Sequence, residues 1–468
     1  MSATAIVGGG LAGLAAAFAL REQGVPVELF EARRALGGRA SSYREASGEL
    51  VDHCQHVSMG CCTSLSDFCR RAGIEDEFRR YETLHFLGPD GKQYDLAAHK
   101  TLPAPLHLLP ALMRLGYFSW RNRVQMASAL LRLARVKLSS PAAEMRMADW
   151  LRAAGQSTQA IEQFWEVVLV SALGETLDRV TVAAARKVFV DGFMTTRAGY
   201  QVLVPQLPLG QLYGERLAAR LREQGVVLHV NATVSQVLGD ARRAIGIRLA
   251  DGTERQFGSV VLATTWRRVS GLLPDSMDVV REQLAGAEQF ESSPITGIHL
   301  WFDRPIMSLP HVVLPGRKSH WLFHVGRSVV PQSDVGEAHY YQVVISASRH
   351  LIGQPREQLV SQIVEELQAA LPDAQAARLL HSRVVTEKHA VFSPLPGSES
   401  ARPAQLTAIP GLFLAGDWTA TGWPATMEGA VRSGYLAAQA VLAEHGQQVS
   451  LLPADPQPNF LARWVTRG

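Results

Sequence analysis

The chain has 468 residues, of which 47% are hydrophobic and 19% charged, and its formal net charge is +3. This composition predicts a globular protein of two or three domains with an ample core. It excludes the strongly basic balance typical of nucleic-acid binding, so we expect no nucleic-acid partner. Because no basic leader precedes the first apolar run, we also expect a cytoplasmic protein without a signal peptide.

The most informative pattern lies near the N-terminus. An apolar run leads into Gly8-x-Gly10-x-x-Gly13, and an alanine-rich stretch follows. A second apolar run at 25–30 ends at Glu31. In such a strand–helix–strand unit the first glycine permits a tight turn, the second leaves room for a pyrophosphate, and the third lets the helix pack closely on the sheet. The helix N-terminus attracts phosphate and the acid can bind a ribose hydroxyl, so the unit predicts an adenine-dinucleotide site.

A second glycine pair follows this unit. Arg33 precedes the segment Gly37-Gly38-Arg39. Paired glycines suit a second close approach to a long cofactor. The Arg39 guanidinium can neutralise pyrophosphate charge as a forked donor.

The far end of the chain carries a matching piece. A short apolar run at 411–415 ends in Gly416-Asp417. We expect a helix from about Pro424, because proline is favoured in the first turn of a helix.

These segments, together with Met427–Gly434, resemble the FAD-dependent amine oxidase and carotenoid desaturase superfamily. The resemblance implies FAD as the cofactor and an α/β fold, in which a discontinuous Rossmann-type parallel-sheet domain binds FAD beside an α+β substrate domain. It implies that Asp417 binds the ribityl chain and that the following helix aims its N-terminus at the flavin. The predicted cofactor contacts are Gly8, Gly10, Gly13, Glu31, Arg33, Gly38, Arg39, Val234, Gly416, Asp417 and Met427.

The predicted domains are interleaved along the chain. The FAD-binding domain is expected to comprise residues 1–80, 200–290 and 395–445. Residues 81–199 are mostly helical by pattern, and residues 291–394 alternate as strands with a helix at about 355–371; together they would form the substrate domain. Residues 446–468 contain three prolines and predict an irregular tail.

All four cysteines lie between Cys54 and Cys69, with His53 and His56 among them. The cysteines lack the Cys-x-x-Cys spacing of zinc sites, so we predict no metal and instead reduced, partly buried thiols.

Three segments, 52–61, 319–323 and 418–429, resemble the hydroxysqualene dehydroxylases, squalene-associated flavoenzymes of bacterial hopanoid pathways. The chain departs from the family pattern at Cys54, where glycine is expected, and at His324. The resemblance implies removal of an allylic hydroxyl from hydroxysqualene, giving squalene and water. Because the sequence carries one dinucleotide motif, we expect an external electron donor.

That reaction needs a proton for the departing hydroxyl and a hydride for the allylic carbon. Asp52, His53, Gln55 and His56 form the best-placed polar cluster, and we predict that they are catalytic. Histidine titrates near neutral pH, so we expect His56 to donate the proton. Asp52 would orient or tune it, and Gln55 would hydrogen-bond flavin or backbone. A structural histidine near the flavin is the alternative.

Three other functions share the fold. A carotenoid or phytoene desaturase runs hydride in the opposite direction. An amine oxidase is disfavoured, because Thr426 stands where that family places a tyrosine of its aromatic cage. A non-catalytic prenyl-binding protein is disfavoured by the intact glycine motif.

A long isoprenoid is nearly insoluble, so the enzyme should take it from a bilayer. Residues 100–138 contain seven basic residues and no acid, interleaved with leucines and aromatics. This pattern predicts an interfacial surface on anionic lipid, and a peripheral position on the inner face of the cell membrane.

Overall fold

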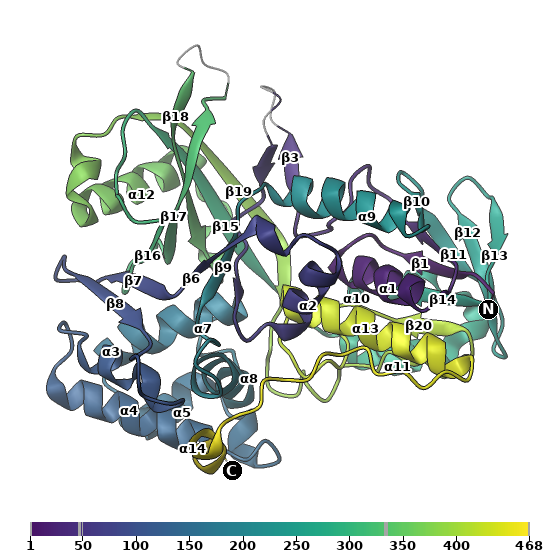
Figure 1. Ribbon diagram of the computed structural model, residues 1–468, viewed down its shortest axis with the longest axis horizontal. Coiled ribbons are helices and arrows are strands. Elements are labelled where there is room, and N and C mark those ends of the chain that lie inside the picture. The colour runs from purple at the N-terminus through teal and green to yellow at the C-terminus, as the bar shows by residue number, and fades with distance from the viewer. Residues whose placement is uncertain (1, 45–47, 49, 332–335, 467–468) are drawn as a thin grey trace.

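The computed structural model describes residues 2–44, 48, 50–331 and 336–466. Its centre is a sheet of five parallel strands in the order β10-β2-β1-β14-β20 (Figure 1). The apolar runs of the four strands other than the edge strand β10 are buried on both faces, as is usual for parallel strands. The strands are β1 (Thr4–Val7), β2 (Val27–Phe30), β10 (Val227–His229), β14 (Ser259–Leu262) and β20 (Leu412–Leu414).

Helices cover one face of this sheet. Gly434 lets α13 approach α1 closely, because a Cβ there would lie 2.3 Å from the carbonyl oxygen of Ala12. The helices of this layer are α1 (Leu11–Glu22), α2 (Thr63–Arg71), α9 (Leu217–Glu223) and α13 (Met427–Glu444).

A second apolar cluster covers the opposite face. It is built from two helices and a three-stranded antiparallel sheet. These elements are α10 (Trp266–Val269), α11 (Asp278–Glu288), β11 (Val234–Gly239), β12 (Ala244–Leu249) and β13 (Glu254–Gln256).

The two inserted segments, 81–199 and 291–394, meet in one seven-stranded sheet, where β16 pairs with β7. Residues 81–199 therefore begin with two strands before their helices. In spatial order the sheet contains β19 (Leu379–Phe392), β15 (Ser292–Phe302), β18 (Glu337–Ile345), β17 (Trp321–Val329), β16 (His311–Val313), β7 (Thr83–Leu87) and β8 (Gln93–Ala97). Helix α12 (Arg356–Ala370) packs on its outer face.

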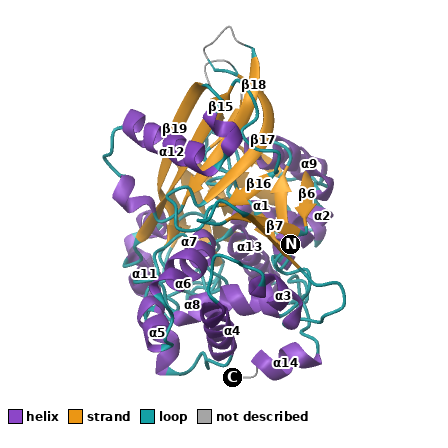
Figure 2. Ribbon diagram, turned by 90° about the vertical axis from the view of Figure 1, so that its left-hand side faces the viewer, coloured by secondary structure: helices purple, strands orange, loops and turns teal. Residues whose placement is uncertain are grey.

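A helical layer lies below this sheet in Figures 1 and 2. Its α-helices are α3 (Leu109–Met113), α4 (Trp120–Ala134), α5 (Met147–Ala153), α6 (Thr158–Ala160), α7 (Glu166–Leu173) and α8 (Val182–Lys187). Two π-helical segments continue it, η4 (Ile161–Trp165) and η5 (Val188–Met194).

Short strand pairs and one more π-helix join the two halves. They are β3 (Ser42–Arg44) with β4 (Leu50–Asp52), then β5 (Ser58–Met59) and β6 (Phe78–Tyr81) on either side of β9 (Val202–Pro205), and η6 (Gly210–Arg216).

Two predictions about helices are wrong. Helix α13 begins at Met427 rather than near Pro424, because the Thr426 side chain caps it by accepting a hydrogen bond from Gly429 N at 3.1 Å. The tail is not irregular throughout. Helix α14 (Phe460–Thr466) forms there because Asn459 Oδ1 accepts from Ala462 N at 2.9 Å and Val465 is buried against α4.

Candidate functional site

The loop after β1 is shaped for a phosphate group. Gly8 has φ +115°, and a Cβ there would lie 2.4 Å from the carbonyl oxygen of Ala263. At Gly10 the nearest described heavy atom to an added Cβ is Gly38 Cα, at 3.9 Å, so the space in front of it is open. Gly10 is also the N-cap of α1, and no described side chain caps the N–H groups at the start of this helix. Open space and free amides at a helix N-terminus suit a pyrophosphate.

Glu31 is held beside this loop. Its Oε2 accepts a hydrogen bond from Gly9 N at 2.7 Å, and its Oε1 accepts from Arg33 N at 2.8 Å. A carboxylate has further lone pairs, so these bonds orient Glu31 and leave it able to accept from a ribose.

An ion pair joins the two ends of the sequence. Arg39 Nη2 lies 2.6 Å from Asp417 Oδ1, and Nη1 donates to the carbonyl oxygen of Ala390 at 2.6 Å. The Asp417 side chain is 4% exposed, and Arg402 Nη2 donates to its backbone oxygen at 3.0 Å. The guanidinium of Arg39 is already paired with the Asp417 carboxylate. Its predicted role in neutralising the charge of a pyrophosphate therefore stays a prediction.

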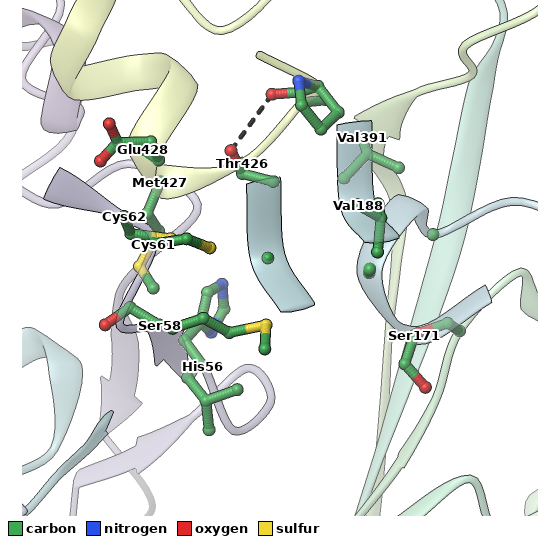
Figure 3. A pocket seen from close by; sticks show the side chains of 18 of the residues that line it. His56, Ser58, Cys61, Cys62, Ser171, Val188, Val391, Thr426, Met427 and Glu428 are labelled. Atoms are coloured by element: carbon green, nitrogen blue, oxygen red, sulfur yellow. Dashed lines mark hydrogen bonds between the residues drawn. The ribbon is translucent and has the colours of Figure 1, made fainter. Parts of the chain in front are cut away.

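A cavity of about 690 Å³ connects these groups to the helical layer. It begins at the carboxyl ends of β1, β14 and β20, the edge where open parallel sheets bind ligands. From there it runs between the seven-stranded sheet and the helices. In Figure 3, His56, Cys61, Cys62 and Met427 stand on one side of it and Val188 and Val391 on the other.

The structure brings most of the predicted site residues to the cavity wall. Lining residues among them are Gly8, Gly10, Glu31, Arg33, Gly38, Arg39, His53, Gln55, His56, Gly416, Asp417 and Met427. Gly13 lies below the loop, where a Cβ would be 2.0 Å from the oxygen of Gly8, and thus serves helix–sheet packing. Val234, the first residue of β11, is buried in the core and is not among the lining residues in the described part of the chain.

The prediction that Asp52 orients His56 is contradicted. The Asp52 carboxylate accepts hydrogen bonds from Ser42 Oγ at 2.5 Å and from Leu209 N at 2.8 Å, and it is not among the described lining residues. Burial raises its pKa to about 6, against an ordinary 3.8. Asp52 therefore ties β4 to the start of η6, because its side chain leaves the strand on the side away from the cavity.

The His56 ring is oriented by backbone instead. Its Nδ1 lies 2.9 Å from the carbonyl oxygen of Cys54. A carbonyl can only accept, so Nδ1 carries the proton and Nε2 of the neutral ring is an acceptor. Burial lowers the His56 pKa, which keeps the ring neutral at pH 7.

The other two predicted catalytic side chains also line the cavity. The His53 ring stacks on Tyr43, with centroids 5.9 Å apart, and burial lowers its pKa. Gln55 Nε2 donates to the backbone oxygen of His56 at 3.4 Å.

Sequence reasoning missed charged groups on the wall, among them Glu387 and Lys187. Lys187 Nζ lies 2.5 Å from Asp191 Oδ2 and 4.6 Å from the centre of the Trp423 ring. Both Lys187 and Trp423 line the cavity. The i,i+4 spacing of Lys187 and Asp191 was visible in the sequence, but such pairs are common on solvated helices.

Glu428 also has a role that the sequence did not indicate. Its carboxylate accepts hydrogen bonds from Ser64 N at 3.0 Å and Leu65 N at 2.7 Å, so it caps α2 from the first turn of α13. Burial raises its pKa.

The cysteines are free thiols, and Cys54, Cys61 and Cys62 line the cavity. Burial raises the pKa of Cys54 to about 12, so it stays protonated. None of the helices in the described ranges has the length and apolar character needed to cross a membrane.

Comparisons with known proteins agree with this geometry. Residues 11–442 match the profile of the family described as flavin containing amine oxidoreductase. The chain is 26% identical to a hydroxysqualene dehydroxylase of Zymomonas mobilis, over 95% of this chain and 100% of that protein. It is 23% identical to a 15-cis-phytoene desaturase of Solanum lycopersicum, over 94% of this chain and 77% of that protein.

Solved structures share the fold. A cyclohexylamine oxidase from Brevibacterium oxydans superimposes with a TM-score of 0.65 at 17% identity, covering 95% of this chain and 100% of that one. The predicted fold class and the predicted FAD cofactor are thereby confirmed.

Proposed function

Because this chain belongs to the flavin containing amine oxidoreductase family, we propose that it is an FAD-dependent enzyme that converts hydroxysqualene to squalene and water. The cavity carries the proposal. Its wall is predominantly apolar between the FAD-binding loops and the leucines of α3 and α4, with Lys187 and Glu387 as charged exceptions. A long isoprenoid alcohol has a single polar group, so an enclosed apolar wall is its complement.

Two hydroxyls on the wall, those of Ser171 and Thr426, are already paired with protein groups. Ser171 Oγ accepts from Trp321 Nε1 at 3.0 Å and donates to the oxygen of Val167 at 2.7 Å. Thr426 Oγ1 donates to the oxygen of Pro424 at 3.1 Å. These two hydroxyls thus offer a polar substrate few further hydrogen bonds.

Lys187 disfavours a cationic amine as substrate. Its ammonium group lies over the Trp423 ring, so this aromatic face is already in contact with a cation of the protein.

When bound and reduced, FAD would supply the hydride that replaces the hydroxyl at the allylic carbon. The departing oxygen takes a proton and leaves as water, and an external donor restores the two electrons.

We assign proton delivery to His56. Its Nδ1 is committed to the Cys54 carbonyl, so a proton exchanged with the substrate hydroxyl passes through Nε2. Because the pKa of His56 is lowered, the protonated ring is rare at neutral pH, but it gives up its proton readily once it forms. Turnover should therefore fall as pH rises through a pKa below the ordinary histidine value of 6.5.

The test is anaerobic incubation of the pre-reduced, FAD-loaded protein with hydroxysqualene. Flavin reoxidation and squalene, measured together, should appear in equal amounts. His56→Gln should retain FAD and lose turnover about 100-fold or more, because glutamine cannot carry the proton. Its matched control is His324→Gln, since His324 is not among the described lining residues.

Two results would overturn the proposal. One is pre-reduced protein that leaves hydroxysqualene unchanged while its flavin stays reduced. The other is reduction of the oxidised flavin by phytoene, which would establish a desaturase.

A further inference from the structure

One face of α4 exposes a row of apolar side chains. Trp120, Val124 and Leu131 recur at spacings of four and seven residues, which places them on one side of a helix. Leu138 continues the row just beyond the helix. Trp120 is 66% exposed, an unusual state for so large an apolar side chain.

Helix α14 extends this surface from the far end of the sequence. Its inner side buries Val465 in a cluster with Ala134 of α4. Its outer side leaves Phe460 86% and Trp464 60% exposed, one helical turn apart. The Trp464 ring lies 5.6 Å from the Arg135 guanidinium. Figures 1 and 2 both place α14 and α4 at the same end of the molecule. We call the six exposed side chains the α4–α14 face: Trp120, Val124, Leu131, Leu138, Phe460 and Trp464.

The cavity reaches the surface beside this face. Leu106, Leu109 and Leu131 are exposed large apolar residues, and all three also line the cavity. Among the described lining residues these are the exposed large apolar side chains, so we infer that the cavity opens there. The mouth therefore lies between the start of α3 and α4.

The two sequence segments that form the face carry charges of one sign. The sequence has no acid between Asp95 and Glu144, and none after Asp455. Exposed basic side chains flank the apolar row, namely Arg121, Arg132, Arg135, Lys137 and Arg463. Apolar and aromatic side chains rimmed by arginine and lysine complement an anionic bilayer.

We propose that the α4–α14 face docks on anionic phospholipid, with α14 as a second anchor beside α4, and that the substrate enters the cavity from the bilayer through the adjacent mouth. The entry route rests on the proposed function, whereas docking does not.

The test is co-sedimentation of the full-length, FAD-loaded protein with vesicles of phosphatidylcholine, with and without phosphatidylglycerol. The wild type should bind the anionic vesicles more strongly, and added salt should weaken binding. Phe460→Ser with Trp464→Ser should lower partitioning about tenfold or more. The matched control is Ile352→Ser with Leu406→Ser, which removes side chains 51% and 57% exposed beside α12 and β20, and it should bind like the wild type.

Equal binding by both double variants would overturn the proposal. So would a wild type that ignores anionic vesicles and forms a dimer in light scattering, because the face would then be a contact between copies. Turnover of detergent-solubilised hydroxysqualene, measured without vesicles, keeps the two proposals separate. If docking fails but turnover persists, only the surface assignment is lost.

Discussion

Replacing Asp52 by asparagine separates a structural role for this residue from a catalytic one. An amide oxygen can still accept the hydrogen bonds from Leu209 N and Ser42 Oγ. The variant lacks the charge that burial disfavours. We therefore expect Asp52→Asn to fold, to keep FAD and to retain turnover.

The expected change in the free energy of unfolding follows from the raised pKa of Asp52. Asp52 has a pKa of about 6 in the folded protein against 3.8 ordinarily. The folded state thus holds this proton more tightly than the unfolded state, so the stability it contributes is present at low pH and is lost as pH rises through about 4 to 6. The difference between these two pKa values corresponds to about 3 kcal/mol in the free energy of unfolding. Asparagine does not titrate, so the unfolding free energy of the variant should rise relative to wild type by up to about 3 kcal/mol over that pH range.

Denaturant unfolding of both proteins at matched pH values measures this difference. Other titrating groups are common to the two chains and cancel. A difference that stays flat between pH 4 and 7, or one that falls, would refute the assignment of a buried, costly charge. Loss of turnover with intact FAD would refute the structural role.

Three further changes test the cofactor site. In Gly10→Ala the added Cβ meets no described heavy atom closer than 3.9 Å and the backbone there is extended, so the protein should fold. The methyl group would fill the open space in front of the loop, so FAD should bind about tenfold or more weakly. The measurement is the FAD content of this variant compared with that of Gly271→Ala, whose Cβ also enters open space. Arg39→Met leaves the buried Asp417 carboxylate without its ion pair and should cost on the order of 2 kcal/mol in denaturant unfolding, since Arg39 is partly exposed; wild-type stability would mean that the pair contributes nothing. Thr426→Ala removes the cap of α13 and should cost about 1 kcal/mol, whereas serine should restore it; equal melting of the alanine and serine variants would contradict the cap.

The catalytic cluster shows where sequence reasoning stops. Asp52, His53 and His56 are close in sequence, but a strand end and a turn send them to different sides. Asp52 turns to η6 and His56 to the cavity. Which side faces the cavity depends on what packs there, and those elements lie far along the chain.

The sequence by itself determined the dinucleotide unit, because the glycine turn, the buried strands and Glu31 are governed by steric and hydrogen-bonding rules within about thirty residues. Only the tertiary structure decided that Arg39 meets Asp417, 378 residues away, that α14 returns to α4, and that the cavity opens beside both. Those contacts arise when distant segments bury surface together, and no local pattern encodes which segments will meet.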